Sequence, residues 1–239
     1  DEAWRRCRKL AESPDILGQF AENLRIRVVG EERAAKLLYL SVTSRFFKRP
    51  ISVVVKGPSS GGKSFLTEQV LNFFPPDAYY ALTAMSPHAM AYSDEPLIHR
   101  FLVLYEATGM ESDIQTYMMR SLLSEGRIRY ETVEKTSEGI RPRLMVREGP
   151  TGLLVTTTSA RLHPENETRL LSLTVSDSQE QTEGIMGALA CEAADDGAVN
   201  GIDYATWHAL QTWLASANHR VVVPYAPLVA REVKPVAVR

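Results

Sequence analysis

Short apolar runs recur along the chain, separated by longer stretches in which apolar residues return every three or four positions. A run of four to eight β-branched or aromatic residues is typical of a buried strand, whereas the longer spacing is typical of a helix with one buried face. The pattern therefore predicts strands at Ile51–Lys56, Tyr79–Ala84, Phe101–Glu106, Gly152–Thr157 and Leu170–Val175.

Helical periodicity fills most of the intervals between these strands. Helices are predicted up to about Arg49, directly after Ser64, at Ser86–Tyr92, at Asp113–Ser124, and from Gln179 to Ala217. Strands that alternate with helices in this order indicate an α/β fold, a three-layer sandwich with a central parallel sheet. The final segment, Val221–Val238, is rich in Pro and β-branched residues and is predicted to favour extended structure.

Residues Gly57–Ser64 read Gly-Pro-Ser-Ser-Gly-Gly-Lys-Ser, which matches the pattern G-x-x-x-x-G-K-[ST]. In this pattern the glycines let backbone N–H groups approach phosphate oxygens, the lysine reaches the β- and γ-phosphates, and the hydroxyl ligates Mg²⁺. A strand before the loop and a helix after it distinguish such a site from a chance glycine turn. The candidate nucleotide-binding residues are Gly57, Pro58, Ser59, Ser60, Gly61, Gly62, Lys63, Ser64 and Phe65.

A carboxylate ends the third predicted strand. Glu106 is placed to orient an attacking water and to share a Mg²⁺ site with Ser64, although a solvated strand-terminal carboxylate is the alternative. The residue before it is Tyr105, where an aspartate usually precedes such a glutamate. Since a tyrosine is uncharged at neutral pH, Ser64 is the better-supported metal ligand.

Two further groups of candidate residues flank the last two strands. A hydroxyl of Thr157 or Thr158 can contact the γ-phosphate or the water, unless these residues only fill the strand. Arg169 is placed to enter the nucleotide site of a neighbouring subunit. The alternative for Arg169 is an ion pair with Glu165 or Glu167, and Arg161 competes for the same role.

Two alternating stretches, Arg127–Val133 and Arg141–Arg147, depart from the strand–helix order and predict a β-hairpin around Glu138–Gly139. Basic and acidic side chains are interleaved along it. The hairpin therefore either contacts a nucleic-acid backbone or forms an ordinary solvated ribbon whose charges pair across the strands. The candidate DNA contacts are Lys135, which is nearest the tip, Arg141 and Arg143.

Composition narrows the class of protein. The chain has 239 residues, of which 44% are hydrophobic and 23% charged, and its net charge of −2 argues against indiscriminate binding to polyanions. No apolar run approaches the about 20 residues needed to cross a bilayer. Two cysteines are too few for a disulfide framework or a zinc site, so a cytoplasmic location is expected. The start, Asp1–Arg6, indicates a piece of a longer chain.

Taken together, these residues resemble the AAA+ ATPases over most of the chain. Gly57–Ser64 is similar to the Walker A loop, Phe101–Glu106 to Walker B, Thr157 or Thr158 to sensor 1, and Arg169 to the arginine finger. The hairpin before the sensor strand is similar to the pre-sensor-1 hairpin, and Ser86–Tyr92 to an insertion in the second helix. These features point to the branch of the minichromosome-maintenance-type helicases and the helicase modules of mobile-element replication proteins.

This resemblance implies a P-loop ATPase that uses ATP and Mg²⁺ and assembles into a ring of identical subunits, expected to be a hexamer. It implies a helicase or translocase of replication, acting on single-stranded rather than duplex DNA and not on membranes, with a primase or zinc-binding domain elsewhere in the full-length chain. It also implies a helical lead-in at 1–49, an AAA+ core at 50–178 and a truncated lid-like segment at 179–239. No sensor 2 arginine is evident in that tail.

Two other functions stay open. One is an AAA+ ATPase that remodels protein partners without touching nucleic acid. The other is a nucleotide-gated scaffold with slow turnover, which the tyrosine at position 105 favours.

Overall fold

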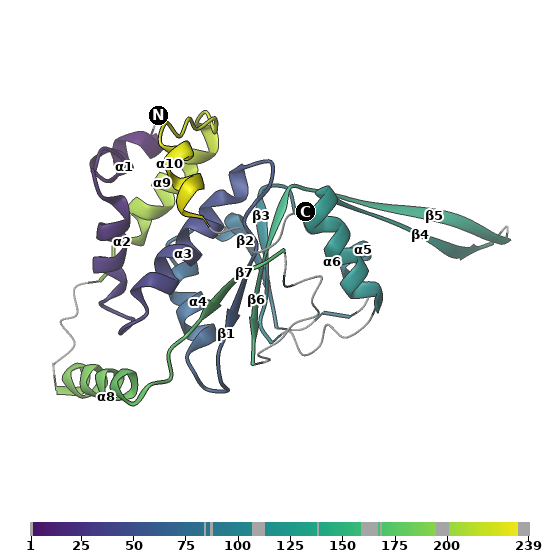
Figure 1. Ribbon diagram of the computed structural model, residues 1–239. Coiled ribbons are helices and arrows are strands. Elements are labelled where there is room, and N and C mark those ends of the chain that lie inside the picture. The colour runs from purple at the N-terminus through teal and green to yellow at the C-terminus, as the bar shows by residue number, and fades with distance from the viewer. Residues whose placement is uncertain are drawn as a thin grey trace.

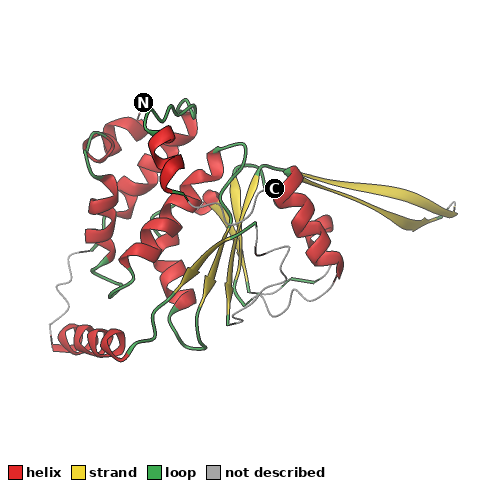
Figure 2. Ribbon diagram, viewed as in Figure 1, coloured by secondary structure: helices red, strands yellow, loops and turns green. Residues whose placement is uncertain are grey.

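The computed structural model describes residues 2–83, 85–86, 88–106, 113–137, 139–158, 167, 169–194 and 201–233. Within these ranges a parallel sheet forms the centre of the molecule, helices cover both of its faces, and one long hairpin projects to the side (Figure 1). The layers are clearest when helices and strands are coloured separately (Figure 2). The α/β sandwich with a central parallel sheet is therefore confirmed.

The central sheet contains five of the described strands, in the order β2-β3-β6-β1-β7. Every pairing between them is parallel, so their carboxyl ends share one edge of the sheet. Because β6 lies between β1 and β3, one strand separates the glycine loop after β1 from Glu106 after β3. The strands are β1 (Val53–Lys56), β2 (Tyr79–Leu82), β3 (Arg100–Leu104), β6 (Thr151–Thr157) and β7 (Leu171–Thr174).

Apolar side chains point alternately to the two faces of the sheet and build two core regions. Val55 and Leu154 pack with α3 and α4 on one face, and Leu104 and Val155 pack with α5 and α6 on the other. Strands buried on both faces need apolar residues at every position, which explains their continuous apolar runs. The covering helices are α3 (Glu32–Thr43), α4 (Lys63–Leu71), α5 (Ala89–Tyr92) and α6 (Asp113–Glu125).

A helical layer beside α3 combines the two ends of the described chain. α9 (Tyr204–Ser216) lies against α1 (Glu2–Ala11), where Trp213 contacts Trp4 at a centroid distance of 4.9 Å. Trp207 of α9 is buried between the rings of Phe20, Tyr39 and Phe73. The remaining helix of this layer is α2 (Ile16–Leu24).

Buried polar contacts fix the same layer. Arg45 of the 3₁₀ turn Ser44–Phe46 donates from Nη1 to Gln211 Oε1 of α9 at 2.7 Å and stacks over the Phe46 ring. Burial lowers the pKa of the Arg45 guanidinium to about 10. The predicted division at 49 and 179 stays a prediction, but these contacts join helices from both of the outer segments.

Two helices of the C-terminal segment, α8 (Gln179–Ala194) and α10 (Ala226–Glu232), contribute no buried residue, among those described, to the core region that contains α9. α8 stands apart from the other helices, at the lower left of Figure 1. α10 corrects the extended structure predicted for Val221–Val238. Its Pro227 lies in the first turn, where a missing N–H costs nothing, so the helix start outweighs the β-branched composition. No helix in the described ranges has the length and apolar character needed to cross a bilayer.

The predicted hairpin is present and longer than its sequence pattern indicates. β4 (Arg127–Thr136) and β5 (Gly139–Glu148) pair in antiparallel register from Arg127↔Glu148 to Thr136↔Gly139. Gly139 adopts φ 122, which a glycine accommodates readily at a tight turn. The base of the ribbon packs on the core beside α6 through Ile128, Tyr130 and Met145, and the outer part extends beyond the body of the protein (Figure 1).

The short helix predicted at Ser86–Tyr92 begins later, at Ala89. The Ala89 N–H bonds the Ser86 carbonyl at 3.1 Å, which forms a turn before the helix, and His88 at the N-cap makes no side-chain capping bond. Pro87, within the predicted helix, lies outside the described residues. A 3₁₀ turn at Pro76–Ala78 lies between α4 and β2.

Candidate functional site

The glycine loop connects the carboxyl end of β1 to the first turn of α4. Gly57 N–H bonds the Thr157 carbonyl of the neighbouring strand at 3.3 Å, and Gly61 N–H bonds the Pro58 carbonyl at 3.1 Å. These bonds curl the loop over the N-terminus of α4, whose unpaired N–H groups and helix dipole attract an anion. The loop predicted from the sequence therefore has the geometry of an anion site.

Two positions in the loop require glycine. Gly62 is the N-cap of α4 with φ 79, a left-handed conformation that costs a residue with a Cβ about 1 kcal/mol or more. A Cβ on Gly57 would overlap the Cγ2 methyl of Val175, just after β7. Ser60 also has a positive φ, 63. Apart from Gly62 itself and its neighbours in the chain, no described atom lies within 4 Å of the position that a Cβ would take on Gly62, so a ligand can approach the backbone there.

Lys63 is the cation of this site. Its side chain is buried, with 4% of the residue exposed, and its Nζ donates to the Pro58 carbonyl at 2.6 Å. Among the described residues the hydrogen-bond partner of this buried ammonium is a backbone carbonyl, which the ammonium can exchange for phosphate oxygens. Ser64 follows it half-buried, and Phe65 is half-exposed at the rim of the loop.

Glu106 is held by its backbone. It follows β3 with φ 63, and its N–H donates to Thr156 Oγ1 of β6 at 3.0 Å. Thr156 is fully buried, whereas the Glu106 side chain is exposed at the carboxyl edge of the sheet. The sequence predicted a hydroxyl of the threonine run between the glycine loop and Glu106 and assigned it to Thr157 or Thr158; it did not predict that Thr156 would accept the Glu106 N–H.

Tyr105 remains a neutral phenol at this edge. Burial, and secondarily the charge of Glu68, raise the pKa of Tyr105 to about 12. Its ring packs on the core region of α3 and α4. The position that usually carries an aspartate therefore supplies apolar contact and no negative charge.

The oxygen ligands present nevertheless suit Mg²⁺. Ser64 offers a hydroxyl at the start of α4 and Glu106 offers a carboxylate, and hard oxygen donors are what this cation prefers. Within the described ranges no group of three or more His, Cys, Asp or Glu side chains could hold a metal ion alone. A site at this edge would therefore need oxygens from a bound phosphate as well.

A cleft of about 1170 Å³ opens beside the glycine loop. Its walls are the linker from Arg25 to Glu31, the first turns of α4, the segment after β7, and α8. Apolar side chains from both sides face it, among them Ile26, Val28, Ile185 and Leu189. An anion site at one end and apolar walls beyond it suit a phosphorylated molecule that carries a planar, weakly polar group.

Hydrogen bonds hold α8 against the linker. Gln181 Nε2 donates to the Val29 carbonyl at 2.5 Å, and Ser176 N–H donates to Glu31 Oε1 at 2.6 Å. The linker lies between α2 and α3, in the short and partly apolar segment Leu24–Gly30. That apolar character was the available signal for the cleft, but its meaning depends on packing against residues about 150 positions later.

The strand ends place the other candidates in different surroundings. Thr157 is buried and lies beside Lys56 in the β1–β6 register, and its carbonyl accepts the Gly57 N–H, whereas Thr158 is exposed just after the strand. Arg169 is exposed before β7, and Arg161 and Glu165 lie outside the described residues. Glu167, a predicted alternative partner of Arg169, forms an ion pair with Lys56.

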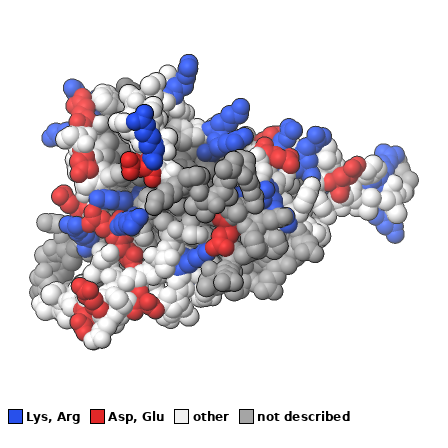
Figure 3. All heavy atoms as spheres, viewed as in Figure 1, with Lys and Arg blue, Asp and Glu red and all other residues white. Residues whose placement is uncertain are grey.

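The hairpin candidates differ in their pairing. Arg143 Nη1 contacts both carboxylate oxygens of Glu134 at 3.2 Å, and Arg141 lies opposite Glu134 in the register. Lys135 is exposed opposite Ile140 and makes no ion pair with any residue in the described ranges. Figure 3 shows basic side chains along the projecting ribbon with acidic ones between them. The cross-strand pairing therefore holds for Arg143, whereas Lys135 is exposed without an ion pair to the described residues.

Comparison with known protein families gives a match to one family model. A family model described as MTBMA_p00010 P-loop domain matches residues 6–203, which include most of the helical lead-in, the glycine loop, the sheet and α8. Curated proteins give no match to the chain.

Proposed function

Because the chain belongs to the MTBMA_p00010 P-loop domain family, we propose that it binds ATP with Mg²⁺ and hydrolyses it as one subunit of an AAA+ motor ring that acts on DNA. A P-loop domain is a nucleotide-binding domain, and the loop–helix arrangement is its phosphate site. One observation carries the proposal: a buried loop lysine, Lys63, and a carboxylate, Glu106, lie at the same edge of the sheet, separated by one strand. Thr156 of that strand accepts a hydrogen bond from the Glu106 backbone.

Binding uses groups already in place. Backbone N–H groups of Gly57–Ser64 and the N-terminus of α4 receive the phosphates, and the Lys63 ammonium leaves the Pro58 carbonyl for them. The apolar walls of the cleft take the base. Ser64 and Glu106 would hold Mg²⁺, which supplies charge neutralisation to the phosphates when bound.

Turnover depends on the position of one carboxylate. The Glu106 carboxylate orients the attacking water toward the γ-phosphate and accepts a proton from that water. The bond from the Glu106 N–H to Thr156 fixes the backbone from which this side chain extends. Of the two threonines predicted to contact the γ-phosphate, Thr158 is exposed just after β6 and is proposed to add that contact, because Thr157 shares the face of Lys56.

The ring and DNA parts of the proposal rest on exposed basic groups. Arg169 lies at the surface before β7, a position from which it can reach the phosphates of a neighbour in a ring of identical subunits. The hairpin extends beyond the body and carries Lys135 near its tip, which suits contact with a single-stranded phosphate backbone.

Two substitutions test the site. Lys63→Ala is expected to abolish nucleotide binding measured with a fluorescent ATP analogue, whereas Glu106→Gln is expected to bind normally and lose at least about 100-fold in ATP turnover. Full turnover by either variant would refute the site. Lys36→Met, which removes a surface lysine paired with Glu32 on α3, is the matched control and should behave as wild type.

A second function, action on a protein partner, has one observation in its favour. The outer part of the hairpin exposes apolar side chains on one face, with Val133 70% and Ile140 72% exposed. Exposed apolar residues of this kind favour contact with protein over contact with a phosphate backbone. Comparing ATP turnover with and without single-stranded DNA separates the two functions, because Lys135→Ala should reduce stimulation only if DNA is the partner.

A further inference from the structure

An ion pair links the strand before the phosphate loop to the segment that carries Arg169. The Lys56 Nζ contacts Glu167 Oε1, although the two residues are far apart in sequence. The Lys56 side chain is only 13% exposed and that of Glu167 is 39% exposed. Lys56 is the last residue of β1 and Gly57 follows it directly, while Glu167 stands two positions before Arg169.

Lys56 is not a second phosphate ligand in this geometry. Val53 and Val55 of β1 face the core region with α3 and α4, and side chains alternate along a strand, so Lys56 faces the opposite side of the sheet. The loop and Lys63 lead into α4, on the Val55 side. The ammonium of Lys56 is therefore directed to Glu167.

The register of the sheet places this pair beside Thr157, on the face of the sheet opposite the phosphate loop. Lys56 is the partner of Thr157 in β6 and of Thr174 in β7. Partners on adjacent parallel strands lie about 4.8 Å apart with side chains on the same face. The row in the register is therefore Thr157, Lys56 and Thr174, and the ion pair joins Lys56 of this row to Glu167, which precedes Arg169 by two residues.

We propose that the Lys56–Glu167 ion pair is a positioning contact that ties Arg169 to the phosphate loop of its own subunit, so that the arginine offered to a neighbour is placed by the local nucleotide site. This inference rests on the proposed function, in which Arg169 acts in a neighbouring site. A carboxylate pinned to the end of β1 limits where the chain two residues later can lie. An arginine donates well-oriented hydrogen bonds to phosphate oxygens only when its backbone is held at a defined position, and this restriction supplies that position.

Mixed rings test this without disturbing the site in which turnover is measured. Arg169→Ala subunits keep an intact site and lack the arginine, whereas Lys63→Ala subunits lack the site and keep the arginine. In a 1:1 mixture about a quarter of the interfaces join an intact site to an intact arginine, so turnover should return to about a quarter of the wild-type rate.

The test variant is placed in the subunit that donates the arginine. A donor with Lys63→Ala and Glu167→Gln, which keeps the side-chain shape, is expected to lower the restored turnover about tenfold, without changing the KM for ATP of the measured site. A donor with Lys63→Ala and Lys56→Met should do the same. Exchanging the charges in the donor, Lys56→Glu with Glu167→Lys, should recover most of the loss.

The controls separate the possible failures. A donor with Lys63→Ala and Lys36→Met, which breaks the surface pair with Glu32 instead, should restore turnover fully. If that donor and the Glu167→Gln donor restore turnover equally, the pair does not position Arg169 and the inference is wrong. If the simple mixture of Arg169→Ala and Lys63→Ala stays inactive although the subunits assemble, the arginine does not act on a neighbour, and the proposed ring mechanism fails first.

Folding of each donor is checked by circular dichroism and by its assembly on size-exclusion chromatography. Glu167→Gln and Lys56→Met break the same contact from opposite sides. If one of them fails to fold, the other still decides the question.

Discussion

Replacing Thr156 by valine should slow ATP turnover without weakening nucleotide binding. Thr156 is fully buried, and its Oγ1 accepts the Glu106 N–H at 3.0 Å. Valine is β-branched like threonine and has nearly the same shape, so the packing of β6 is kept while the hydroxyl acceptor is lost. The substitution therefore isolates the contact that fixes the backbone of Glu106.

The size of the expected fall in turnover follows from two opposing contributions, the backbone strain at Glu106 and the hydrogen bond that offsets it. Glu106 has φ 63, a left-handed conformation that costs a non-glycine residue roughly 1–2 kcal/mol. The hydrogen bond contributes about 1 kcal/mol net, so it offsets much of this strain. Without it, the observed backbone conformation should lose about 1 kcal/mol relative to relaxed alternatives, which corresponds to about a fivefold fall in its population.

Steady-state ATP turnover and analogue binding measure the two sides of this prediction. Thr156→Val should reduce the turnover rate about fivefold, with the dissociation constant unchanged within about twofold. Thr156→Ser keeps the hydroxyl and loses a methyl group, so it should retain most of the turnover and lose about 1 kcal/mol of stability. That variant is the matched control for packing.

A double variant tests whether Thr156 acts through Glu106. If Thr156 acts through Glu106, adding Thr156→Val to Glu106→Gln should produce no further loss of turnover, because the carboxylate it positions is already gone. A further fivefold loss in the double variant would show that Thr156 acts on some other part of the site.

Three other substitutions have expected outcomes. Gly57→Ala places a methyl group against the Val175 side chain and should lower both nucleotide affinity and stability, the latter by about 1–3 kcal/mol, as measured by urea unfolding and analogue binding. Tyr105→Phe should leave ATP turnover unchanged at neutral pH, because the phenol is neutral there. Since the folded-state pKa of Tyr105 is raised from 10.0 to about 12, wild type should lose stability relative to Tyr105→Phe as the pH rises between those two values, and an equal pH profile for the two would contradict the assignment. Trp207→Ala should destabilise the protein by about 3–5 kcal/mol in chemical unfolding, because this buried ring joins α9 to the N-terminal helices.

The parts of the fold that were predictable are those encoded over short distances in sequence. The loop Gly57–Ser64 has fixed spacing, and the central strands are continuous apolar runs, so the sequence alone locates both. The hairpin was predicted but too short, since the polar residues near its tip pair through backbone bonds that composition does not reveal. The helix at Ala226–Glu232 was missed because β-branched residues outweighed the proline start signal.

The unpredicted parts depend on contacts between distant segments. The cleft beside the loop forms only when the linker of Val28 and Val29 meets α8, and neither segment has a motif. Thr156 could not be distinguished from Thr157 and Thr158 without knowing which hydroxyl faces the turn after β3. The pairing of Lys56 with Glu167 required a register that no local pattern encodes.

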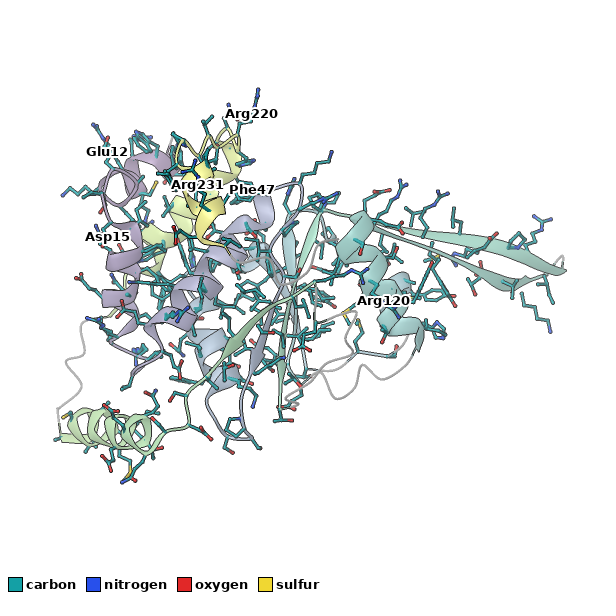
Figure 4. All side chains as sticks on the ribbon, viewed as in Figure 1. Glu12, Asp15, Phe47, Arg120, Arg220 and Arg231 are labelled. Carbon is teal, nitrogen blue, oxygen red and sulfur yellow. The ribbon has the colours of Figure 1, made fainter. Side chains whose placement is uncertain are left out.

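The packing of α9 on α1 also sets the order in which the protein can fold on the ribosome. Figure 4 shows side chains filling the layer where these helices meet, with Glu12 and Asp15 on its outer side and Arg220 and Arg231 at its upper end. The aromatic side chains of Phe20 and Tyr39 bury against a tryptophan, Trp207, that is translated long after them. At bacterial or eukaryotic elongation rates this delay is on the order of 10–40 s. During that time the nascent N-terminal helices expose an apolar face, which is the kind of surface that chaperones bind and that aggregates when they are absent.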